Sequence, residues 1–306
     1  MIHIYEIKKN LGEQIKKIRK NKKMTQKELG GSLLSQPTLT KIEKKGIITS
    51  YSNYLFIADQ LNVSIDELNY LANNKHVSPF QEILLERRNQ RLRRFNPVKM
   101  DKYIAKCVDY YERTNNRAFW LLEQSAISWK VFHANFEVAT LVEYSNKIKI
   151  ELGNMDKWYL FEIEMMASAL YGFNADEVQE IGEYLLDCLK EYKSFIMTEA
   201  LKLEIILGVM AVLSWNKRSA DVIKWGEKII LGTWNSESRK YLHIINFRLA
   251  LAYLDTNDQK NFHKKMQCAM VLVTIYNINY ILEPWKIEVK KNYAEYDDKL
   301  KEYGLV

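Results

Sequence analysis

The chain has 306 residues, of which 47% are hydrophobic and 27% charged, and its net charge at neutral pH is +7. This length suffices for two domains, and this balance of apolar and charged residues excludes wholesale disorder. With only 11 glycines and 4 prolines the chain has little turn material for an all-β fold, so we expect a mostly helical protein.

The excess positive charge is confined to the first 50 residues, which contain 12 Lys or Arg and 4 Asp or Glu. The remainder contains 33 basic and 34 acidic residues and is nearly neutral. A basic head on a neutral body favours a polyanion as partner. The alternative, a basic arm on a membrane surface, would need an amphipathic helix without a compact fold, whereas this head contains turns, caps and its own apolar positions.

The three cysteines, Cys107, Cys188 and Cys268, are widely separated and have no metal-ligand spacing, so we expect reduced thiols. The longest apolar stretch, Ile205 to Leu213, is too short for a membrane span. The first four residues lack the order of a signal peptide. We therefore expect a cytoplasmic protein without a membrane partner, a metal or a cofactor.

Apolar spacing and capping residues predict five short helices in residues 1–75. Leu11, Ile15 and Ile18 define the first helix. Thr25 caps the second, and Glu28 completes a capping box three residues later. The other three are expected at residues 35–45, 51–61 and 64–71.

The stretch from Leu34 to Glu43 has the pattern of the recognition helix of a helix-turn-helix. Ser35 is a good N-cap and Pro37 falls in the first turn, where a missing N–H costs little. Leu39 and Ile42 face inward, whereas the amide, hydroxyl and cation of the outward residues can reach base edges or phosphates. For this stretch alone, a capped surface helix is the alternative. The residues assigned to DNA binding are Gln26, Ser35, Gln36, Pro37, Thr38, Thr40, Lys41, Lys44 and Lys45, with Gln26 as a phosphate contact.

The head resembles the phage-repressor (Xre/Cro-type) helix-turn-helix domain. The residues that carry this resemblance are Arg19, the run Met24 to Leu29, Leu39, Ile42, Glu43, Gly46 and the run Leu61 to Leu68. The resemblance implies that Arg19 and Glu43 form a partly buried structural pair. The short turn before Leu-Ser-x-x-x-Leu-Thr-Lys-Ile-Glu is similar to the Rgg/MutR/GadR regulators, although Gly30 replaces the usual Ala and lowers helix propensity.

Residues 76–97 are expected to form a linker and connecting helix, because Pro79 restricts the preceding residue and can open a helix. The basic run from Arg87 to Arg94 either extends the DNA-binding surface or forms a solvated face. Residues 98–306 show helix after helix, and successive pairs have the period of helix-pair solenoids. The sequence thus predicts an all-α protein, in which a five-helix phage-repressor-like domain at residues 1–75 precedes a tetratricopeptide-like (TPR-like) helical repeat domain at residues 98–306. A plain helical bundle is the alternative for the second part.

Breaks between the helices of the body are expected where small, polar or turn-forming residues cluster. They lie near Asn96-Pro97, Thr114 to Asn116, Gly153-Asn154, Gly172 to Asn174, Trp215-Asn216, Gly232 to Ser236, Asp255 to Asp258 and Asn277.

The run from Asn154 to Ile163 again resembles the Rgg family, which has a Trp followed by Tyr-Glu-Ile-like residues here. The resemblance implies a cytoplasmic, homodimeric transcription regulator whose repeat domain binds a short imported signalling peptide, as in quorum sensing. It implies double-stranded DNA as the second partner and RNA polymerase as a further candidate. Certain members have a basic residue in the peptide groove where this chain has Tyr171, so no carboxylate-binding role transfers there.

The sequence shows no spacing typical of an active site, such as His-Glu-x-x-His, a Gly-rich phosphate loop or Cys-x-x-Cys. We therefore expect a binding protein and not an enzyme. Two functions remain. In the first, the body senses a peptide and changes the geometry of two DNA-binding heads; in the second, the chain is a ligand-independent helix-turn-helix repressor with a helical dimerisation scaffold.

Asn246 and Arg248 lie within the apolar run from Ile244 to Ala252, where an unpaired charge would be costly. A groove for a carboxylate or a peptide backbone would explain them, and so would an internal ion pair. For the groove, Asn246 and Arg248 are the expected polar contacts, and the expected apolar walls are Trp158, Tyr171 and Trp285.

Overall fold

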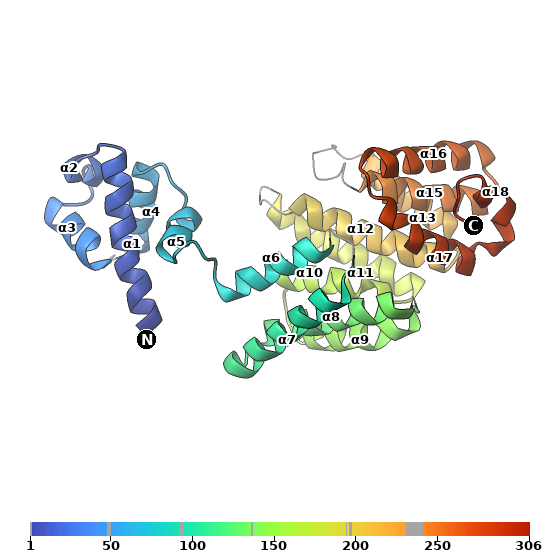
Figure 1. The fold of residues 1–306 in the computed structure, drawn as a ribbon, viewed down its shortest axis with the longest axis horizontal. Helices are drawn as coiled ribbons and strands as arrows, with labels where there is room; N and C mark the ends of the chain where they lie inside the picture. The colour runs from blue at the N-terminus through green and yellow to red at the C-terminus, as the bar shows by residue number, and fades with distance from the viewer. Residues whose placement is uncertain are drawn as a thin grey trace. The chain divides into compact units, whose positions relative to one another are not determined.

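The computed structural model describes residues 2–47, 50–91, 95–135, 137–193, 195, 198–230 and 241–306, and every regular element within these ranges is a helix. The all-α prediction is therefore confirmed. The chain divides into two compact units, Met1–Glu86 and Arg87–Val306 (Figure 1). The division falls within the predicted connecting segment and inside one helix, α6 (Pro79–Arg91). In the described part of the chain, no helix is both long and apolar enough to cross a membrane.

Unit 1 contains five helices before α6, as predicted. They are α1 (Ile2–Asn21), α2 (Gln26–Gly30), α3 (Gln36–Lys45), α4 (Tyr51–Gln60) and α5 (Ile65–Ala72). α1 begins nine residues before Leu11, where the predicted periodicity starts. The local signals are present as expected: Thr25 and Glu28 form the capping box of α2, Ser35 caps α3, and Gly46 ends α3 in the left-handed conformation.

The core of unit 1 is formed by apolar residues from all five helices. Ile15 of α1, Leu29 of α2 and Leu39 of α3 are fully buried. Gly30 is buried too, and a Cβ there would lie 3.0 Å from Cδ1 of Leu39. The close packing of α2 on α3 thus explains why glycine is suited to this position despite its low helix propensity.

The described residues of unit 2 contain a series of helices. They are α7 (Pro97–Thr114), α8 (Arg117–Asn135), α9 (Ala139–Gly153), α10 (Leu160–Ala169), α11 (Ala175–Cys188), α12 (Thr198–Trp215), α13 (Ser219–Ile230), α15 (Leu242–Asp255), α16 (Gln259–Ile275), α17 (Leu282–Asn292) and α18 (Asp297–Lys301). Four 3-10 turns lie between them, namely η1 (Leu170–Gly172), η2 (Leu189–Tyr192), η3 (Asn279–Ile281) and η4 (Ala294–Tyr296).

The predicted breaks in the described part of unit 2 fall between these helices, whereas the break at Gly232 to Ser236 lies outside the described residues. The breaks between α8 and α9 and between α11 and α12 were not predicted. Residues 134–138 and 189–197 contain neither glycine nor proline, so the sequence carries no strong turn signal there.

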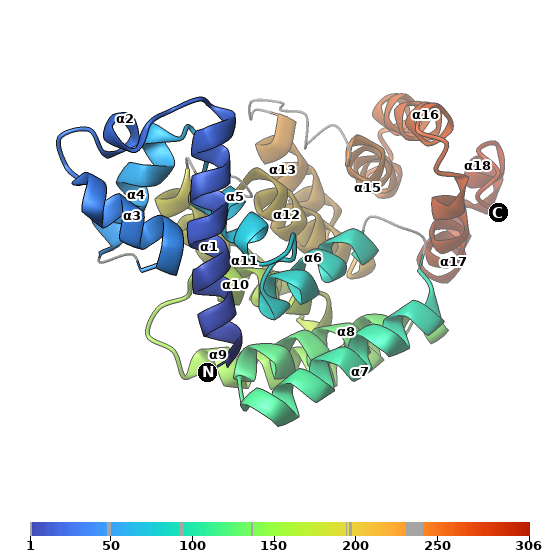
Figure 2. The same cartoon turned by 60° about the vertical axis from the view of Figure 1, so that its left-hand side comes forward.

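Consecutive helices of unit 2 pack side by side: α7 on α8, α8 on α9, α12 on α13 and α15 on α16 (Figure 2). α12 lies at the centre, in contact with α10, α11, α13 and α15. It contains the longest apolar stretch and buries nearly every residue from Leu201 to Ser214, as expected for a helix that is apolar on all sides. At the C-terminal end, α15, α16 and α17 share a second core around Phe247, Phe262 and Trp285.

Gly12 tests the packing of α1 on the end of α3. A Cβ at Gly12 would lie 2.2 Å from the carbonyl oxygen of Ile42 and 2.9 Å from the amide nitrogen of Gly46. Because both are backbone atoms, Gly12→Ala is expected to lower the free energy of unfolding by about 2–3 kcal/mol. Amide hydrogen exchange in α1 and α3 of the full chain measures the effect.

Gly153→Ala is the matched control, since a Cβ at Gly153 meets no atom within 4 Å. We expect this change to leave exchange in α9 slower or unaltered. Equal exchange rates in α1 and α3 for wild type and Gly12→Ala would show that the two helices do not pack as described.

Candidate functional sites

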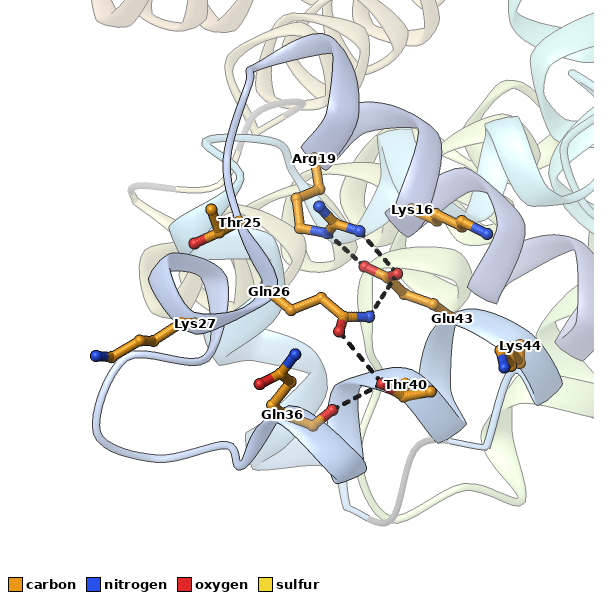
Figure 3. A pocket seen from close by; sticks show the side chains of 9 residues that line it. All are labelled: Lys16, Arg19, Thr25, Gln26, Lys27, Gln36, Thr40, Glu43 and Lys44. Carbon is orange, nitrogen blue, oxygen red and sulfur yellow. Dashed lines mark hydrogen bonds and ion pairs between the residues drawn. The ribbon is translucent and has the colours of Figure 1, made fainter.

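The carboxylate of Glu43 lies at the centre of a hydrogen-bonded network in unit 1 (Figure 3). The guanidinium of Arg19 donates from Nε to Glu43 Oε1 at 2.5 Å and from Nη2 to Oε2 at 2.9 Å. Its third nitrogen donates to the carbonyl oxygen of Met24 at 2.7 Å. Gln26 Nε2 donates to Glu43 Oε2 at 2.9 Å, so the network joins α1, α2 and α3.

The electrostatics of this network favour the charged forms of both partners. Burial alone would raise the pKa of Glu43, but hydrogen bonds from Arg19 and Gln26 outweigh it and hold that pKa below its usual value. The hydrogen bond to Glu43 raises the pKa of Arg19. The two side chains are buried and serve as structural partners, as the resemblance implies.

The network leaves one face of α3 open to solvent. Gln36, Pro37 and Lys41 are exposed on it, as are Lys44 and Lys45 in its last turn. Thr38 is half-buried, and its hydroxyl lies 2.8 Å from that of Ser35. An exposed amide and several cations on one helical face are the groups that contact bases and phosphates.

A hollow of about 390 Å³ lies between α2 and α3, beside this face. Besides Arg19, its cationic lining residues are Lys16 of α1, Lys27 of α2 and Lys44 of α3 (Figure 3). Lys16 and Lys27 were not among the predicted site residues. Each lies in a helix whose inward residues could be recognised from their spacing, but which outward cation borders α3 depends on the tertiary packing.

Gln26 is predicted to contact a phosphate through its side chain or its backbone amide. In the structure its side-chain Nε2 donates to Glu43, and its Oε1 accepts from the hydroxyl of Thr40 at 3.2 Å. The side-chain amide therefore links α2 to α3, and a phosphate contact through the backbone amide stays a prediction. Thr40, which also lies 2.9 Å from the carbonyl oxygen of Gln36, is likewise engaged within unit 1.

A cleft of about 1690 Å³ lies within unit 2. It is bordered by residues of α8, α9, α12, α15 and α17, among others. Its lining is rich in aromatic side chains, which are Phe95, Tyr103, Trp129, Phe132, Tyr171, Trp215, Tyr241, Tyr276, Tyr280 and Trp285. A concave, largely apolar surface with a few polar groups is typical of a ligand site.

Arg248 is a buried cation of the cleft lining. It is 8% exposed, and its Nη1 forms an ion pair with Oε1 of Glu288 on α17. Burial lowers the pKa of Arg248 to about 10, while Tyr293 and Tyr171 act in the opposite direction. The guanidinium thus remains charged at neutral pH. Its ion pair with Glu288 is the internal pair that the sequence allowed as one explanation of a charge in this apolar helix.

Two of the other predicted cleft residues lie at the cleft and two do not. Tyr171 and Trp285 line it, and Trp285 stacks on Phe247 with ring centroids 4.0 Å apart. Asn246 is not in the lining and donates from Nδ2 to the carbonyl oxygen of Leu242 at 2.7 Å. Residues two positions apart lie on opposite sides of a helix, so Asn246 and Arg248 of α15 cannot face one groove together.

Trp158 also lies outside the cleft lining. Its Nε1 donates to the carbonyl oxygen of Leu152 at 2.9 Å, and its ring meets that of Tyr184 edge to face. This tryptophan therefore packs the junction after α9 and forms no wall of the cleft.

The beginning of the basic run has a different role from either one predicted. Arg87 is buried and donates to Oε1 of Glu164 at 2.5 Å, and Arg88 donates to Oε2 at 2.7 Å. Both arginines thereby fasten the end of α6 to α10, so they form neither a solvated face nor a DNA-binding surface. The side chains from Arg91 to Arg94 lie outside the described residues.

Other types of site find no support in the described part of the chain. No group of three His, Cys, Asp or Glu side chains there could hold a metal ion. Burial lowers the pKa of His133, a cleft residue, to about 4, so this imidazole is neutral at pH 7. The three cysteines are free thiols.

These features define a two-part protein in which a helix-turn-helix domain precedes a helical repeat domain with a large cleft. Residues 15–68 match the helix-turn-helix family, which covers the predicted capping box and recognition helix. No curated protein sequence matches the chain.

The fold of nearly the whole chain is similar to solved structures of low sequence identity. A candidate transcriptional regulator from Listeria monocytogenes EGD-e is 15% identical, with a TM-score of 0.71 over 94% of this chain and 98% of that one. PlcR of Bacillus thuringiensis, in complex with the peptide PapR7 and DNA, is 13% identical, with a TM-score of 0.61 over 90% of this chain and 98% of that one. The Streptococcus dysgalactiae SHP pheromone receptor Rgg2 is 16% identical, with a TM-score of 0.61 over 92% of this chain and 99% of that one.

Glu43→Gln tests the buried network through its pH dependence. The folded-state pKa of Glu43 is below the usual value of about 4.3, so its ionisation stabilises the fold above that pH and ceases to do so as the pH falls through the folded-state pKa. At pH 7 the variant is expected to lose about 3 kcal/mol of unfolding free energy, because Arg19 is left buried without an anion.

The difference from wild type should shrink as the pH falls below the usual value of about 4.3 and through the lowered folded-state pKa, as measured by urea unfolding followed through hydrogen exchange in α3. Glu13→Gln is the control, since Glu13 is an exposed residue of α1. A loss for Glu43→Gln that is the same at every pH would contradict the proposed role of its charge.

Proposed function

We propose that the protein is a cytoplasmic DNA-binding transcriptional regulator, controlled by a short peptide that binds in the cleft of unit 2. One observation carries this proposal: a helix-turn-helix unit with an exposed basic face is joined by α6 to a repeat unit with an aromatic cleft. Solved structures of the same fold support it, since PlcR was crystallised with a peptide and DNA and Rgg2 is a pheromone receptor.

In the proposed complex with double-stranded DNA, α3 enters the major groove. Gln36 would bond to a base edge through its exposed amide, and Lys41 would contact a base or phosphate nearby. Lys44 and Lys45, in the last turn of α3, would contact phosphates and contribute affinity without sequence preference. Lys16 and Lys27 border the same face and would extend the phosphate contacts.

The cleft supports a ligand more readily than it supports a scaffold alone. A domain that served only for dimerisation would need no concave surface of this size, whereas a large cleft with an aromatic lining and a few polar groups is typical of a ligand site. An extended peptide of apolar residues would cover the aromatic lining, and its backbone would need a few polar partners in the wall. Binding of this kind requires no catalysis.

We further propose that the regulator acts as a homodimer. One small recognition helix buries too little surface for tight binding to one site, and two heads related by a two-fold axis would bind two half-sites. RNA polymerase is a further candidate partner only if the regulator activates transcription.

Selection of binding sites from random DNA tests the proposed DNA contacts. The selected sites are expected to contain inverted repeats, and Gln36→Ala should weaken binding to them by about 1–3 kcal/mol while binding to random DNA changes much less. Lys45→Ala is the comparison, and it should lower affinity for both kinds of DNA and reduce the salt dependence. Single half-sites would argue against the dimer, and equal losses on both DNAs would exclude base readout by Gln36.

Obstruction of the cleft tests the proposed peptide site. Ala139 is an exposed residue of the lining, whereas Ala220 is exposed on α13 and outside the lining. In calorimetric titrations with a pool of apolar heptapeptides, Ala139→Trp should weaken binding about tenfold or more, which corresponds to about 1.4 kcal/mol. Ala220→Trp should bind the pool as wild type does. If the pool releases no heat with wild type and causes no thermal shift, the ligand-independent repressor is the better account.

A further inference from the structure

The guanidinium of Arg248 has donors that no described residue uses. Its Nη1 is paired with Glu288, but its Nε lies buried without an acceptor. The residue is more than nine-tenths buried and belongs to the cleft lining. A buried N–H without an acceptor is costly, so a ligand that supplies one at this place gains more than it would from a solvated donor.

The charge of Arg248 is already balanced. Glu288 is itself 11% exposed in its side chain, and its Oε1 also accepts from Nε1 of Trp215 at 3.1 Å. The arginine and the glutamate together carry no net charge, and the tryptophan holds the carboxylate in place. A ligand that meets this pair encounters a fixed N–H donor in neutral surroundings.

The remainder of the cleft offers no surplus of positive charge. Among the described lining residues, four carboxylates face three basic side chains, and Arg87 is already bonded to Glu164. The acidic residues are Glu137, Glu204, Glu283 and Glu288, and the basic ones are Arg87, Arg248 and Lys291. A second carboxylate beside Arg248 would place two anions on one guanidinium in a poorly solvated site, whereas a neutral carbonyl adds no charge.

We infer that Arg248 binds a neutral carbonyl oxygen of the peptide through its guanidinium, and that the Arg248–Glu288 pair discriminates against a carboxylate at that place. This inference rests on the proposed peptide function and specifies its chemistry. The acceptor is a backbone or side-chain amide carbonyl within an apolar stretch, because Trp215 and Trp285 form the neighbouring walls. Charged ends of the peptide then lie away from Arg248.

The first test uses wild-type protein alone. The pool of apolar heptapeptides is prepared once with C-terminal amides and once with free C-terminal carboxylates, and both are titrated calorimetrically. We expect the amides to bind as tightly as the acids or more tightly. Acids that bind about tenfold more tightly would show that Arg248 receives a carboxylate, and would overturn the inference.

The second test locates the acceptor. In the tightest heptapeptide, each backbone amide is replaced in turn by an ester, whose carbonyl is a weaker acceptor of similar shape. At one position the ester should weaken binding to wild type about tenfold. Arg248→Lys should abolish that position-specific loss, since lysine keeps the charge beside Glu288 but lacks the additional N–H donors of the guanidinium.

Thermal unfolding of Arg248→Lys establishes that the variant is folded. If it is not, the wild-type ester series alone decides, and no sensitive ester position would refute the role of a carbonyl acceptor. Heptapeptides that bind with an identical ester pattern in wild type and Arg248→Lys would also refute the role of Arg248 while leaving the peptide function intact. No binding by either pool would refute the peptide function itself, together with this inference.

Discussion

The arrangement of unit 1 depends on one buried carboxylate. Glu43 belongs to α3, and its donors come from Arg19 of α1 and Gln26 of α2, so the orientation of α3 is fixed from two sides. Removing either charge would leave the other buried without a partner, which costs far more than the pair contributes. Because Glu43 must face Arg19 and Gln26, the opposite, basic face of α3 is turned to solvent.

Unit 2 contains two buried ion pairs that impose the same kind of constraint. Glu164 pairs with Arg87, and Glu288 pairs with Arg248, each from a helix distant in the sequence. Apolar helical surfaces can pack in several registers at similar cost, because the hydrophobic effect has no direction. A register that left one of these charges unpaired would be heavily disfavoured, so the ion pairs restrict which helices meet around the cleft.

Features encoded by local chemistry could be predicted from the sequence. Thr25, Ser35 and Gly46 act at helix ends through their own backbone neighbours, so the five helices of unit 1 followed from short patterns. The pairing of Arg19 with Glu43 required the family resemblance, because nothing within the 23 residues between them indicates contact. Glu288 could not be identified as the partner of Arg248 because α17 has the charge pattern of an ordinary solvated helix. The burial of Arg87 against α10 could not be predicted for the same reason, because Arg87 is the first residue of a basic run that has the pattern of a solvated surface.

Arg87 links the cleft of unit 2 to α6. It belongs to α6, which is continuous from Pro79 to Arg91, and its guanidinium both lines the cleft and bonds to Glu164. It also lies 3.4 Å from the hydroxyl of Ser125, another cleft residue, which in turn donates to Ser168. If α6 has two arrangements, a ligand that binds one of them more tightly shifts the equilibrium toward that one. The shift in free energy equals the difference between its two binding free energies and cannot exceed it. Because Arg87 lies within α6, such a change would also alter the environment of that helix, which is continuous from Arg87 back to Pro79.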